Sequence, residues 1–306
     1  MSTKTRHLLT LEELSNKDLL GLLDLASQVK KKPAKYRKAL KGQTLGMIFE
    51  KSSTRTRVSF EVGMFQLGGH ALFLSSNDIQ IGRGETIADT AKVLSRFVQG
   101  VMIRTFAHQT VEDLATNATI PVINGLSDSH HPCQILADLQ TLQEHFKKLK
   151  GLQIVFVGDG NNVSNSLMIG AAKTGAHFKL VCPKSYEPDA AILKRAQKEA
   201  AGTGSRIEIT QKVQGSVKGA DAVYTDVWTS MGQEAEKTKR LNDFKGFQVD
   251  EKLMAESPEA VFLHCLPAHR GEEVSAGVMD GKQSVVFDQA ENRLHAQKAL
   301  LIYLMG

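Results

Sequence analysis

Short apolar segments alternate with longer amphipathic segments along most of the chain. The apolar segments are rich in β-branched residues and have the length of buried strands. We expect strands at residues 44–49, 71–74, 101–103, 121–124, 153–157, 179–182, 206–209, 222–224, 261–264 and 285–287. Helical spacing of apolar residues predicts helices at residues 11–29, 88–97 and 192–200. Strands that alternate with helices indicate βαβ units, so the expected fold class is α/β with mostly parallel sheets flanked by helices.

One helix near the middle of the chain is predicted with particular clarity. Pro132 suits a first helical turn, and Gly151 after a run of lysines suits a helix end. Between them, apolar residues recur every three or four positions: Ile135, Leu139, Leu142, Phe146 and Leu149. No Pro-, Gly- or Ser-rich linker interrupts this region. We therefore expect two domains, residues 1–133 and 134–289, joined by a rigid helix.

Composition narrows the class of protein. The 306 residues are 42% hydrophobic and 23% charged, which suits a globular chain with a large core. No apolar run reaches the roughly 18 residues of a membrane span, and no signal peptide is apparent. The three cysteines are neither paired in number nor at metal-ligand spacing. These features predict a cytoplasmic protein with no structural metal.

The net charge of +5 raises the question of nucleic-acid binding. The basic clusters at residues 30–32 and 147–150 are short and end helical segments, where cations suit the helix dipole. Aromatic residues are only 6% of the chain and do not alternate with these clusters. A small anionic substrate is the better explanation, and we expect no nucleic-acid partner.

A polar segment directly follows the first predicted strand and precedes a helical pattern. Ser53 can cap that helix, and its free N–H groups carry partial positive charge. Thr54, Arg55 and Thr56 add hydroxyl groups and a guanidinium. Together they predict a site for a phosphate or carboxylate. Arg57 points away from Arg55 on a helix and is expected to pair with Glu61 instead.

Two further polar residues follow predicted strands of the same half of the chain. In open α/β sheets, ligands bind at the carboxyl ends of the strands. Arg104 ends one strand, and we expect it beside the Arg55 segment rather than on the open surface. His131 precedes the central helix and is a helix cap, a solvated residue or a donor to a carbonyl oxygen. Cys133 has no paired base, so we favour a packing role over a nucleophilic one.

The second half contains a segment that begins like a dinucleotide-binding motif. Val163 stands where the third glycine belongs, and the next strand ends at Cys182 instead of an acid. This argues against a nicotinamide cofactor. Asn161 and Asn162 place amide groups at a strand edge, which suits a polar ligand. Asp226 follows another strand and is either an ammonium partner or a solvated acidic residue.

Two sites near the end of the chain are less specific. A strand runs directly into Cys265, Leu266 and Pro267, and because proline cannot continue a central strand the backbone must turn there. Buried packing is the commoner role for a residue such as Cys265. Arg293 lies in a final amphipathic helix and either points into a site or is solvated.

Four motifs occur together in this chain. They are Ser-Thr-Arg-Thr-Arg at 53–57, His-Pro-Cys-Gln at 131–134, Asp-Val-Trp-Thr-Ser-Met-Gly at 226–232 and His-Cys-Leu-Pro at 264–267. Over its whole length the chain resembles the aspartate/ornithine carbamoyltransferase family, and the last three motifs resemble its ornithine branch. The resemblance implies a carbamoyl-phosphate-binding domain, an ornithine-binding domain, and a C-terminal helix at 290–306 that packs back on the first. It also implies a homotrimer with shared active sites and a cis bond before Pro267.

The resemblance further implies a role for each motif residue. Carbamoyl phosphate would be bound by Ser53, Thr54, Arg55, Thr56, Arg104, His131, Gln134, Cys265, Leu266 and Arg293, with Gln80 reaching in from the adjacent subunit in a loop at 75–85. Ornithine would be bound by Asn162, Asp226, Ser230 and Met231. The catalytic set would be Arg55, Arg104, His131, Asp226 and Cys265. No cofactor or metal is expected.

The implied reaction transfers a carbamoyl group from carbamoyl phosphate to the side-chain amine of L-ornithine. The products are L-citrulline and phosphate, in arginine biosynthesis or arginine breakdown. A carbamoyltransferase with another amine acceptor is the main alternative. A non-catalytic protein that retains the fold is the alternative from a different class.

Overall fold

The computed structural model describes residues 5–76, 79–230 and 232–306. The chain forms two compact units, which we call unit 1 (residues 1–140 and 292–306) and unit 2 (residues 141–291). The boundary expected at residue 133 lies in the first turn of helix α6 (Pro132–Phe146), and the division into units falls later in that helix. Within the described residues, no helix has the length and apolar character needed to span a membrane.

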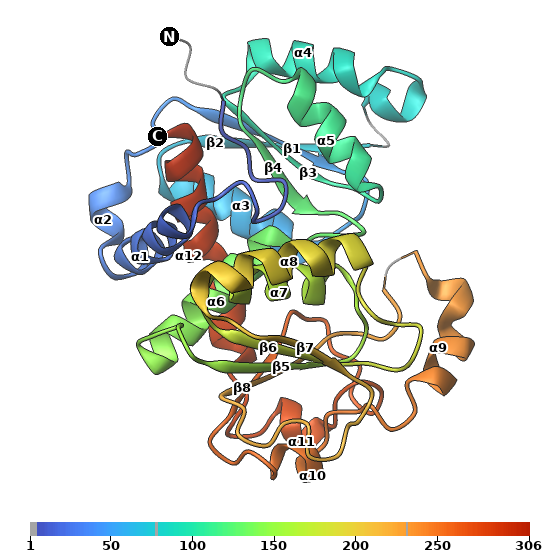
Figure 1. Cartoon of the computed structure of the whole chain (residues 1–306). Helices are drawn as coiled ribbons and strands as arrows, with labels where there is room; N and C mark the ends of the chain where they lie inside the picture. The colour runs from blue at the N-terminus through green and yellow to red at the C-terminus, as the bar shows by residue number, and fades with distance from the viewer. Residues whose placement is uncertain (1–4, 77–78, 231) are drawn as a thin grey trace. The chain divides into compact units, whose positions relative to one another are not determined.

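Unit 1 is built on a four-stranded parallel sheet with the strand order β2-β1-β3-β4. Its strands are β1 (Thr44–Phe49), β2 (His70–Ser75), β3 (Gly100–Arg104) and β4 (Val122–Leu126). Its helical elements are α1 (Asn16–Lys31), α2 (Pro33–Tyr36), α3 (Thr54–Gln66), η1 (Gln80–Arg83), α4 (Ile87–Phe97) and α5 (His108–Asn117). Helices α4 and α5 cover one face of the sheet, and α3 lies on the other (Figure 1). The apolar core under α4 and α5 includes Ile48, Ile103 and Leu114.

Unit 2 is built on a five-stranded parallel sheet with the order β7-β6-β5-β8-β9. Its strands are β5 (Gln153–Val157), β6 (His177–Val181), β7 (Ile207–Thr210), β8 (Ala222–Thr225) and β9 (Val261–His264). Its helical elements are α7 (Asn162–Thr174), α8 (Ala190–Thr203), η2 (Glu234–Glu236), α9 (Lys237–Asp243), α10 (Glu251–Met254) and α11 (Ala276–Met279). Helices α7 and α8 lie on one face, and α10 and α11 on the other (Figure 1).

Two units with parallel sheets confirm the expected fold class, and all predicted strands but one are confirmed to within about two residues. The prediction of a strand at 285–287 is wrong, because Val286 begins α12 (Val286–Met305). Only Ser284 forms an isolated bridge there, with Phe262. The predicted helix at 11–29 begins late, because the Ser15 side chain caps α1 and the residues before it form turns.

Helix α12 completes unit 1 with its second part. An added Cβ at Gly63 of α3 would contact the side chains of Leu294, Lys298 and Leu301. Helices α3 and α12 therefore lie next to each other at Gly63, with room for no more than a small side chain. The expectation that the C-terminal helix packs back on the first half of the chain agrees with this contact.

Candidate active site

The amino end of α3 has the geometry expected for an anion site. The Ser53 hydroxyl caps the helix and accepts a hydrogen bond from the Thr56 amide at 3.2 Å. Thr54 is exposed, Arg55 is half-buried and Thr56 is buried. The expected pairing of Arg57 is confirmed, since its Nε lies 2.9 Å from Glu61 Oε1. Arg55 therefore remains beside the free N–H groups of the helix end.

A chain of buried hydrogen bonds connects this helix end to α12 and α6. Arg293 is 4% exposed, so the alternative of a solvated side chain does not apply. Its Nη2 donates to Thr56 Oγ1 at 3.1 Å, and its Nη1 donates to Gln134 Oε1 at 2.7 Å. Gln134 in turn donates to Asp138 Oδ1 at 2.8 Å. Asp138 did not stand out in the sequence, although it lies one helical turn after Gln134 in a predicted helix.

Arg104 and His131 lie at the same end of the sheet. Arg104 is the last residue of β3, pairs in register with Phe49 of β1, and is 7% exposed. The pKa of His131 is well below its ordinary value, mainly because the ring is buried. The charges of Arg293, Arg104 and Arg55 lower it further. The imidazole is therefore neutral, in a region dominated by guanidinium groups.

Two other buried residues of unit 1 lie close in sequence to these candidates, Cys133 and Lys51. Cys133 is buried, and its thiol donates to the carbonyl oxygen of Asn124 at 3.3 Å. Burial raises the pKa of this thiol to about 12, which confirms the packing role. Lys51, which the sequence did not single out, is 7% exposed and has its Nζ 4.2 Å from the centre of the Phe106 ring. Sequence alone gives no indication that a loop lysine is buried beside such a site.

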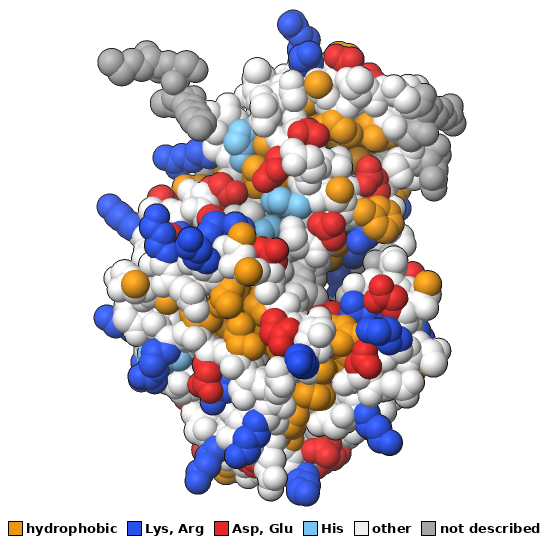
Figure 2. All heavy atoms as spheres, turned by 45° about the vertical axis from the view of Figure 1, so that its right-hand side comes forward, with side chains coloured by type: hydrophobic (Ala, Val, Ile, Leu, Met, Phe, Trp, Pro, Cys, Tyr) orange, Lys and Arg blue, Asp and Glu red, His pale blue; other side chains and the backbone are white. Residues whose placement is uncertain are grey.

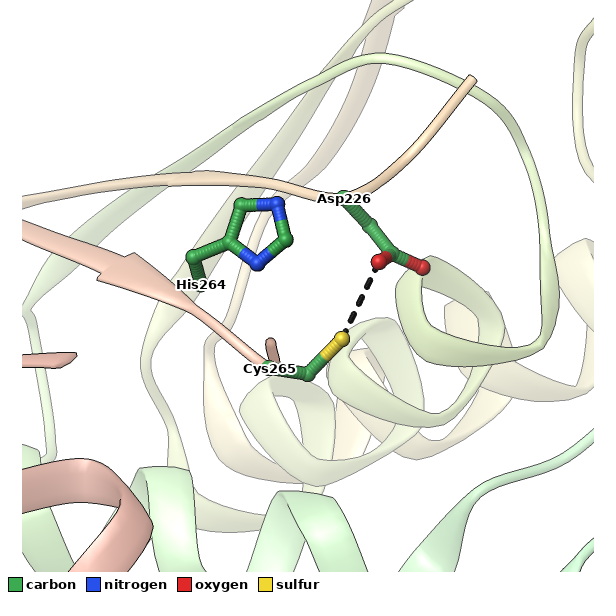
Figure 3. Close-up of side chains that lie close together, drawn as sticks. All are labelled: Asp226, His264 and Cys265. Carbon is green, nitrogen blue, oxygen red and sulfur yellow. Dashed lines mark hydrogen bonds between the residues drawn. The ribbon is translucent and has the colours of Figure 1, made fainter. Parts of the chain in front are cut away.

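In unit 2, the polar residues gather around Asp226, which directly follows β8. Figure 3 shows the Cys265 thiol pointing at this carboxylate, and the Sγ–Oδ1 distance is 3.0 Å. The other oxygen accepts from Asn161 Nδ2 at 2.8 Å. Asp226 is 6% exposed, so the alternative of a solvated acidic turn does not apply. The thiol is half-buried and faces a charged partner, rather than filling an apolar core.

The two neighbouring asparagines differ in what they contact. Asn161 caps α7, and its side-chain oxygen accepts from the amides of Val163 at 3.0 Å and Ser164 at 3.1 Å. Its side-chain nitrogen is thereby directed at Asp226. Asn162 is the first residue of α7 and is half-buried. The resemblance assigned only Asn162 to the site, whereas the structure adds Asn161 as the residue that orients Asp226.

The backbone turns sharply after β9, as the proline position predicts. Leu266 has φ of 59°, and the Leu266–Pro267 bond is cis, as the resemblance implies. The Leu266 amide donates to His264 Nδ1 at 2.9 Å, and His264 Nε2 lies 3.2 Å from Glu273 Oε1. Both nitrogens of His264 are therefore occupied.

Three candidates from the sequence remain, and they lie outside the contacts described above. Ser230 is half-buried in the segment before α9, and its amide donates to Gln233 Oε1 at 3.0 Å. Met231 lies outside the described residues. Gln80 is exposed at the start of η1, and in the part of the chain that the structure describes no hydrogen bond joins it to the Arg55 cluster.

Two groups among the described residues of unit 2 have the atoms of a metal site: Asp226 with His264 and Cys265, and His269 with Glu272 and Glu273. The first of them belongs to the cluster around Asp226. Donor atoms of Asp226, His264 and Cys265 lie within 4.8 Å of one another. Their present contacts, to Asn161, to Glu273 and the Leu266 amide, and between thiol and carboxylate, already use these atoms. The group therefore functions in this structure as a hydrogen-bond network.

The face drawn in Figure 2 carries both signs of charge, with Lys and Arg side chains interspersed among Asp and Glu side chains.

Two models of known protein families match this chain. The model described as "Aspartate/ornithine carbamoyltransferase, carbamoyl-P binding domain" matches residues 6–144. The model described as "Aspartate/ornithine carbamoyltransferase, Asp/Orn binding domain" matches residues 150–304. The chain belongs to the aspartate/ornithine carbamoyltransferase family. The resemblance seen in its motifs is thereby confirmed.

Individual members of the family are similar over the full chain. Ornithine carbamoyltransferase of Oceanobacillus iheyensis is 59% identical over 306 residues, covering 99% of this chain and 95% of that protein. The structure of ornithine carbamoyltransferase from Pyrococcus furiosus has a TM-score of 0.95 at 52% identity, covering 100% of this chain and 99% of that one. An acetylornithine transcarbamylase complexed with acetylcitrulline has a TM-score of 0.89 at 33% identity, covering 98% and 99%.

Proposed function

We propose that the protein transfers the carbamoyl group of carbamoyl phosphate to the side-chain amine of L-ornithine, giving L-citrulline and phosphate. The observation that carries this proposal is the cluster of Arg55, Arg104 and Arg293 around a neutral His131 at the amino end of α3. Such a cluster suits a substrate that joins a phosphate to a carbonyl group. The similarity to ornithine carbamoyltransferases supports the same reaction.

The residues of unit 1 bind carbamoyl phosphate in this proposal. Ser53, Thr54 and Thr56 offer hydroxyl and backbone donors to the phosphate, and Arg55 and Arg104 offer charge-assisted hydrogen bonds. Neutral His131 donates a hydrogen bond to the carbonyl oxygen, where negative charge grows during the reaction. Arg293, already bonded to Gln134, keeps the carbamoyl-binding amide in place.

The residues of unit 2 bind ornithine. The buried Asp226 carboxylate, oriented by Asn161, pairs with the ammonium group of the amino acid. Asn162, Ser230 and Met231 bind its α-amino and carboxylate groups. Cys265 and Leu266, in the turn after β9, lie near the reacting amine and the carbamoyl group.

The chemistry needs positioning and charge stabilisation more than it needs a cofactor. The neutral amine attacks the carbonyl carbon, a tetrahedral species forms, and the bond to phosphate oxygen breaks. An amine with an ordinary pKa of about 10.4 is mostly protonated at neutral pH, so it must lose a proton first. Cys265, Asp226 and the departing phosphate are the candidate acceptors. Carbamoyl phosphate is itself an activated compound, so no metal ion or cofactor is required.

We further propose that the enzyme is a cytoplasmic homotrimer whose active sites are shared between subunits. Exposed apolar side chains occur on α3 and on the neighbouring edge strand β2: Val58, Phe65, Leu72 and Phe73. Phe65 alone is 80% exposed, which suits a surface that is covered by a second copy. Exposed Gln80 follows β2 and would reach a neighbour's carbamoyl phosphate from there.

The choice of acceptor amine is the point on which family members differ. One structural relative is an acetylornithine transcarbamylase, at 33% identity. A buried carboxylate such as Asp226 favours an acceptor with a free ammonium group, because an acetylated amine carries no charge. This favours L-ornithine, with another amine acceptor as the alternative.

The proposal is tested by phosphate release from carbamoyl phosphate. L-ornithine, N-acetylornithine, putrescine, L-lysine and L-aspartate are offered separately, and citrulline is assayed in parallel. We expect release with L-ornithine alone. Release with another amine would overturn the assignment of Asp226 and Ser230, and no release with any amine would favour a non-catalytic protein.

A substitution links this activity to the proposed site. Arg55→Ala should reduce turnover by several orders of magnitude, because Arg55 is proposed to stabilise the leaving phosphate. The control is Arg37→Ala, which removes an exposed guanidinium elsewhere in unit 1. Circular dichroism should show both variants folded, and near-normal turnover in Arg55→Ala would contradict the assignment.

A further inference from the structure

A single buried guanidinium holds both ends of the segment that carries Ser230. Arg240 lies in α9 and is 7% exposed. Its Nη1 donates to the carbonyl oxygen of Trp228 at 3.0 Å, and its Nε donates to Glu236 Oε2 at 3.0 Å. Trp228 precedes Ser230 and Glu236 follows it. One side chain therefore contacts both stems of this segment, and we call its described residues, 229–230 and 232–235, the Ser230 loop.

The same guanidinium joins the Ser230 loop to the start of α7. Arg240 Nη1 also donates to Asp159 Oδ2 at 2.7 Å. Asp159 lies in the turn between β5 and α7, two residues before Asn161. Asn161 is the residue that orients Asp226. Arg240 thus contacts residues close in sequence to Ser230 and to Asn161, the partner of Asp226.

The surroundings of Arg240 favour one fixed arrangement. Its Cζ lies 5.1 Å from the centre of the Tyr186 ring. Phe244 stacks on Trp228 with 5.6 Å between ring centres, and lies edge-on to Tyr186 at 4.6 Å. In this setting the side-chain exposures of Arg240 and Asp159 are 9% and 11%, unlike those of a surface ion pair. A displaced guanidinium would leave Asp159 without its buried partner, so few alternative positions are available.

We propose that Arg240 is a positioning residue for ornithine binding, which acts with Asp159 to hold the Ser230 loop against the start of α7. Arg240 itself touches no substrate in this scheme. The inference rests on the proposed function and deepens it, because it names two residues that fix the positions of the ornithine-binding groups. An arginine suits this task because its planar guanidinium directs hydrogen bonds to several partners at once.

The test separates the two substrates. Arg240→Gln removes the charge and the multiple contacts, and Asp159→Asn removes the charge of the partner with little change in shape. We expect KM for L-ornithine to rise on the order of tenfold to a hundredfold, as small misplacements of binding groups do elsewhere. KM for carbamoyl phosphate should stay within about twofold of the wild-type value, because the residues proposed to bind its phosphate group lie in unit 1.

Arg240→Lys tests the role of the guanidinium shape. A lysine retains the charge and can approach Asp159, but it cannot bond three partners in the fixed directions of arginine. The increase in KM for L-ornithine should therefore lie between those of the wild type and Arg240→Gln. An increase equal to that of Arg240→Gln would assign the effect to the loss of the planar geometry.

A neighbouring residue supplies the matched control. Lys239 lies on the same helix, where its Nζ bonds Asp243 at 3.0 Å and the Tyr186 hydroxyl at 3.2 Å. Lys239→Gln should leave both KM values unchanged. Trp228 is the single tryptophan of the chain, so its fluorescence reports on the loop stem directly. We expect Arg240→Gln to alter the emission and its response to L-norvaline, which lacks the reacting amine.

The outcomes are distinct. If the role of Arg240 is purely structural, its substitution should lower the melting temperature and the yield but leave KM for L-ornithine unchanged in the folded fraction. That result, in Arg240→Gln or in Asp159→Asn, would overturn the proposal. If Arg240→Gln does not fold, KM for L-ornithine in Asp159→Asn and Arg240→Lys provides the same test. Failure of the proposed function differs, since the wild-type protein would then show no turnover with L-ornithine.

Discussion

Burial decides how the charged residues of this protein behave. His131 is buried beside three arginines, and both effects oppose a second positive charge on its ring. A neutral ring still carries one N–H group, which can donate a hydrogen bond to a carbonyl oxygen. Burial raises the pKa of Asp159, and the hydrogen bond from Arg240 Nη1 at 2.7 Å opposes that rise.

The state of His131 has a consequence for stability. Its pKa in the folded protein lies below the unfolded value of 6.5, so the unfolded chain binds the proton more tightly. Stability is therefore lost as the pH falls below about 6.5. We expect His131→Gln to flatten this dependence by at most about 1.4 kcal/mol per pH unit, in urea unfolding from about pH 5 to 8.

An exposed histidine provides the comparison for this measurement. The control is His145→Gln, which replaces a solvent-exposed ring at the end of α6. Equal slopes in the wild type and in His131→Gln would show that folding does not lower the pKa of His131. That result would contradict a ring held neutral by burial and by the neighbouring arginines.

At the scale of single residues, sequence patterns located most of the candidate site but not its internal contacts. Arg55, Arg104, His131 and Asp226 all follow predicted strands, and strand ends are where parallel sheets expose groups to ligands. Asn161 was visible only as an amide at a strand edge. Its cap of α7 and its bond to Asp226 depend on side-chain directions that spacing does not determine.

Helix ends link the elements of the fold to the site. Ser15 and Ser53 cap α1 and α3 in the same way, with hydroxyl groups that accept from amides at 3.0 Å and 3.2 Å. Ser15→Ala and Ser53→Ala should therefore each lower stability by about 1 kcal/mol, measured by urea unfolding. Only Ser53→Ala should also raise KM for carbamoyl phosphate, because only that cap lies in the proposed phosphate site. An equal effect of both variants on KM would contradict this role.

At the scale of elements, the buried parallel strands were the most predictable part. Segments such as 154–157 are continuously apolar because both faces of the sheet are covered, and few other structures show that pattern. The error at 285–287 has the opposite cause. A short apolar run has the same appearance in a strand and in the first turn of a helix, and Phe287 is 70% exposed in α12.

The molecule as a whole consists of two units that share two helices. Helix α6 leaves unit 1 at Gln140, and α12 returns to it at Asn292. The return places Arg293 within hydrogen-bond distance of Thr56, 237 residues away in sequence. A contact between residues so far apart in sequence cannot be predicted from periodicity or composition. The sequence therefore did not distinguish a buried Arg293 from a solvated one.

A shared active site makes a prediction about mixed assemblies. Arg55→Ala and Gln80→Ala proteins should each be inactive, since each lacks one proposed ligand of every site. Mixed in equal amounts, dissociated and reassembled, they should recover about one quarter of wild-type turnover, because that fraction of sites takes both intact residues from different subunits. No recovery, with hybrid trimers demonstrated by native mass spectrometry, would place Gln80 outside the site or within its own subunit.

The discontinuity of unit 1 also bears on how the protein is made. A ribosome releases the chain from its amino end, and compact units generally fold as they emerge. Unit 2 is one continuous stretch, residues 141–291, whereas unit 1 is started first and closed only by residues 292–306. Unit 1 therefore begins to be synthesised first but is complete only when the last residues are made. A chain that ends at a premature stop codon before Arg293 could fold unit 2, but its unit 1 would lack the buried guanidinium that bonds Thr56 and Gln134.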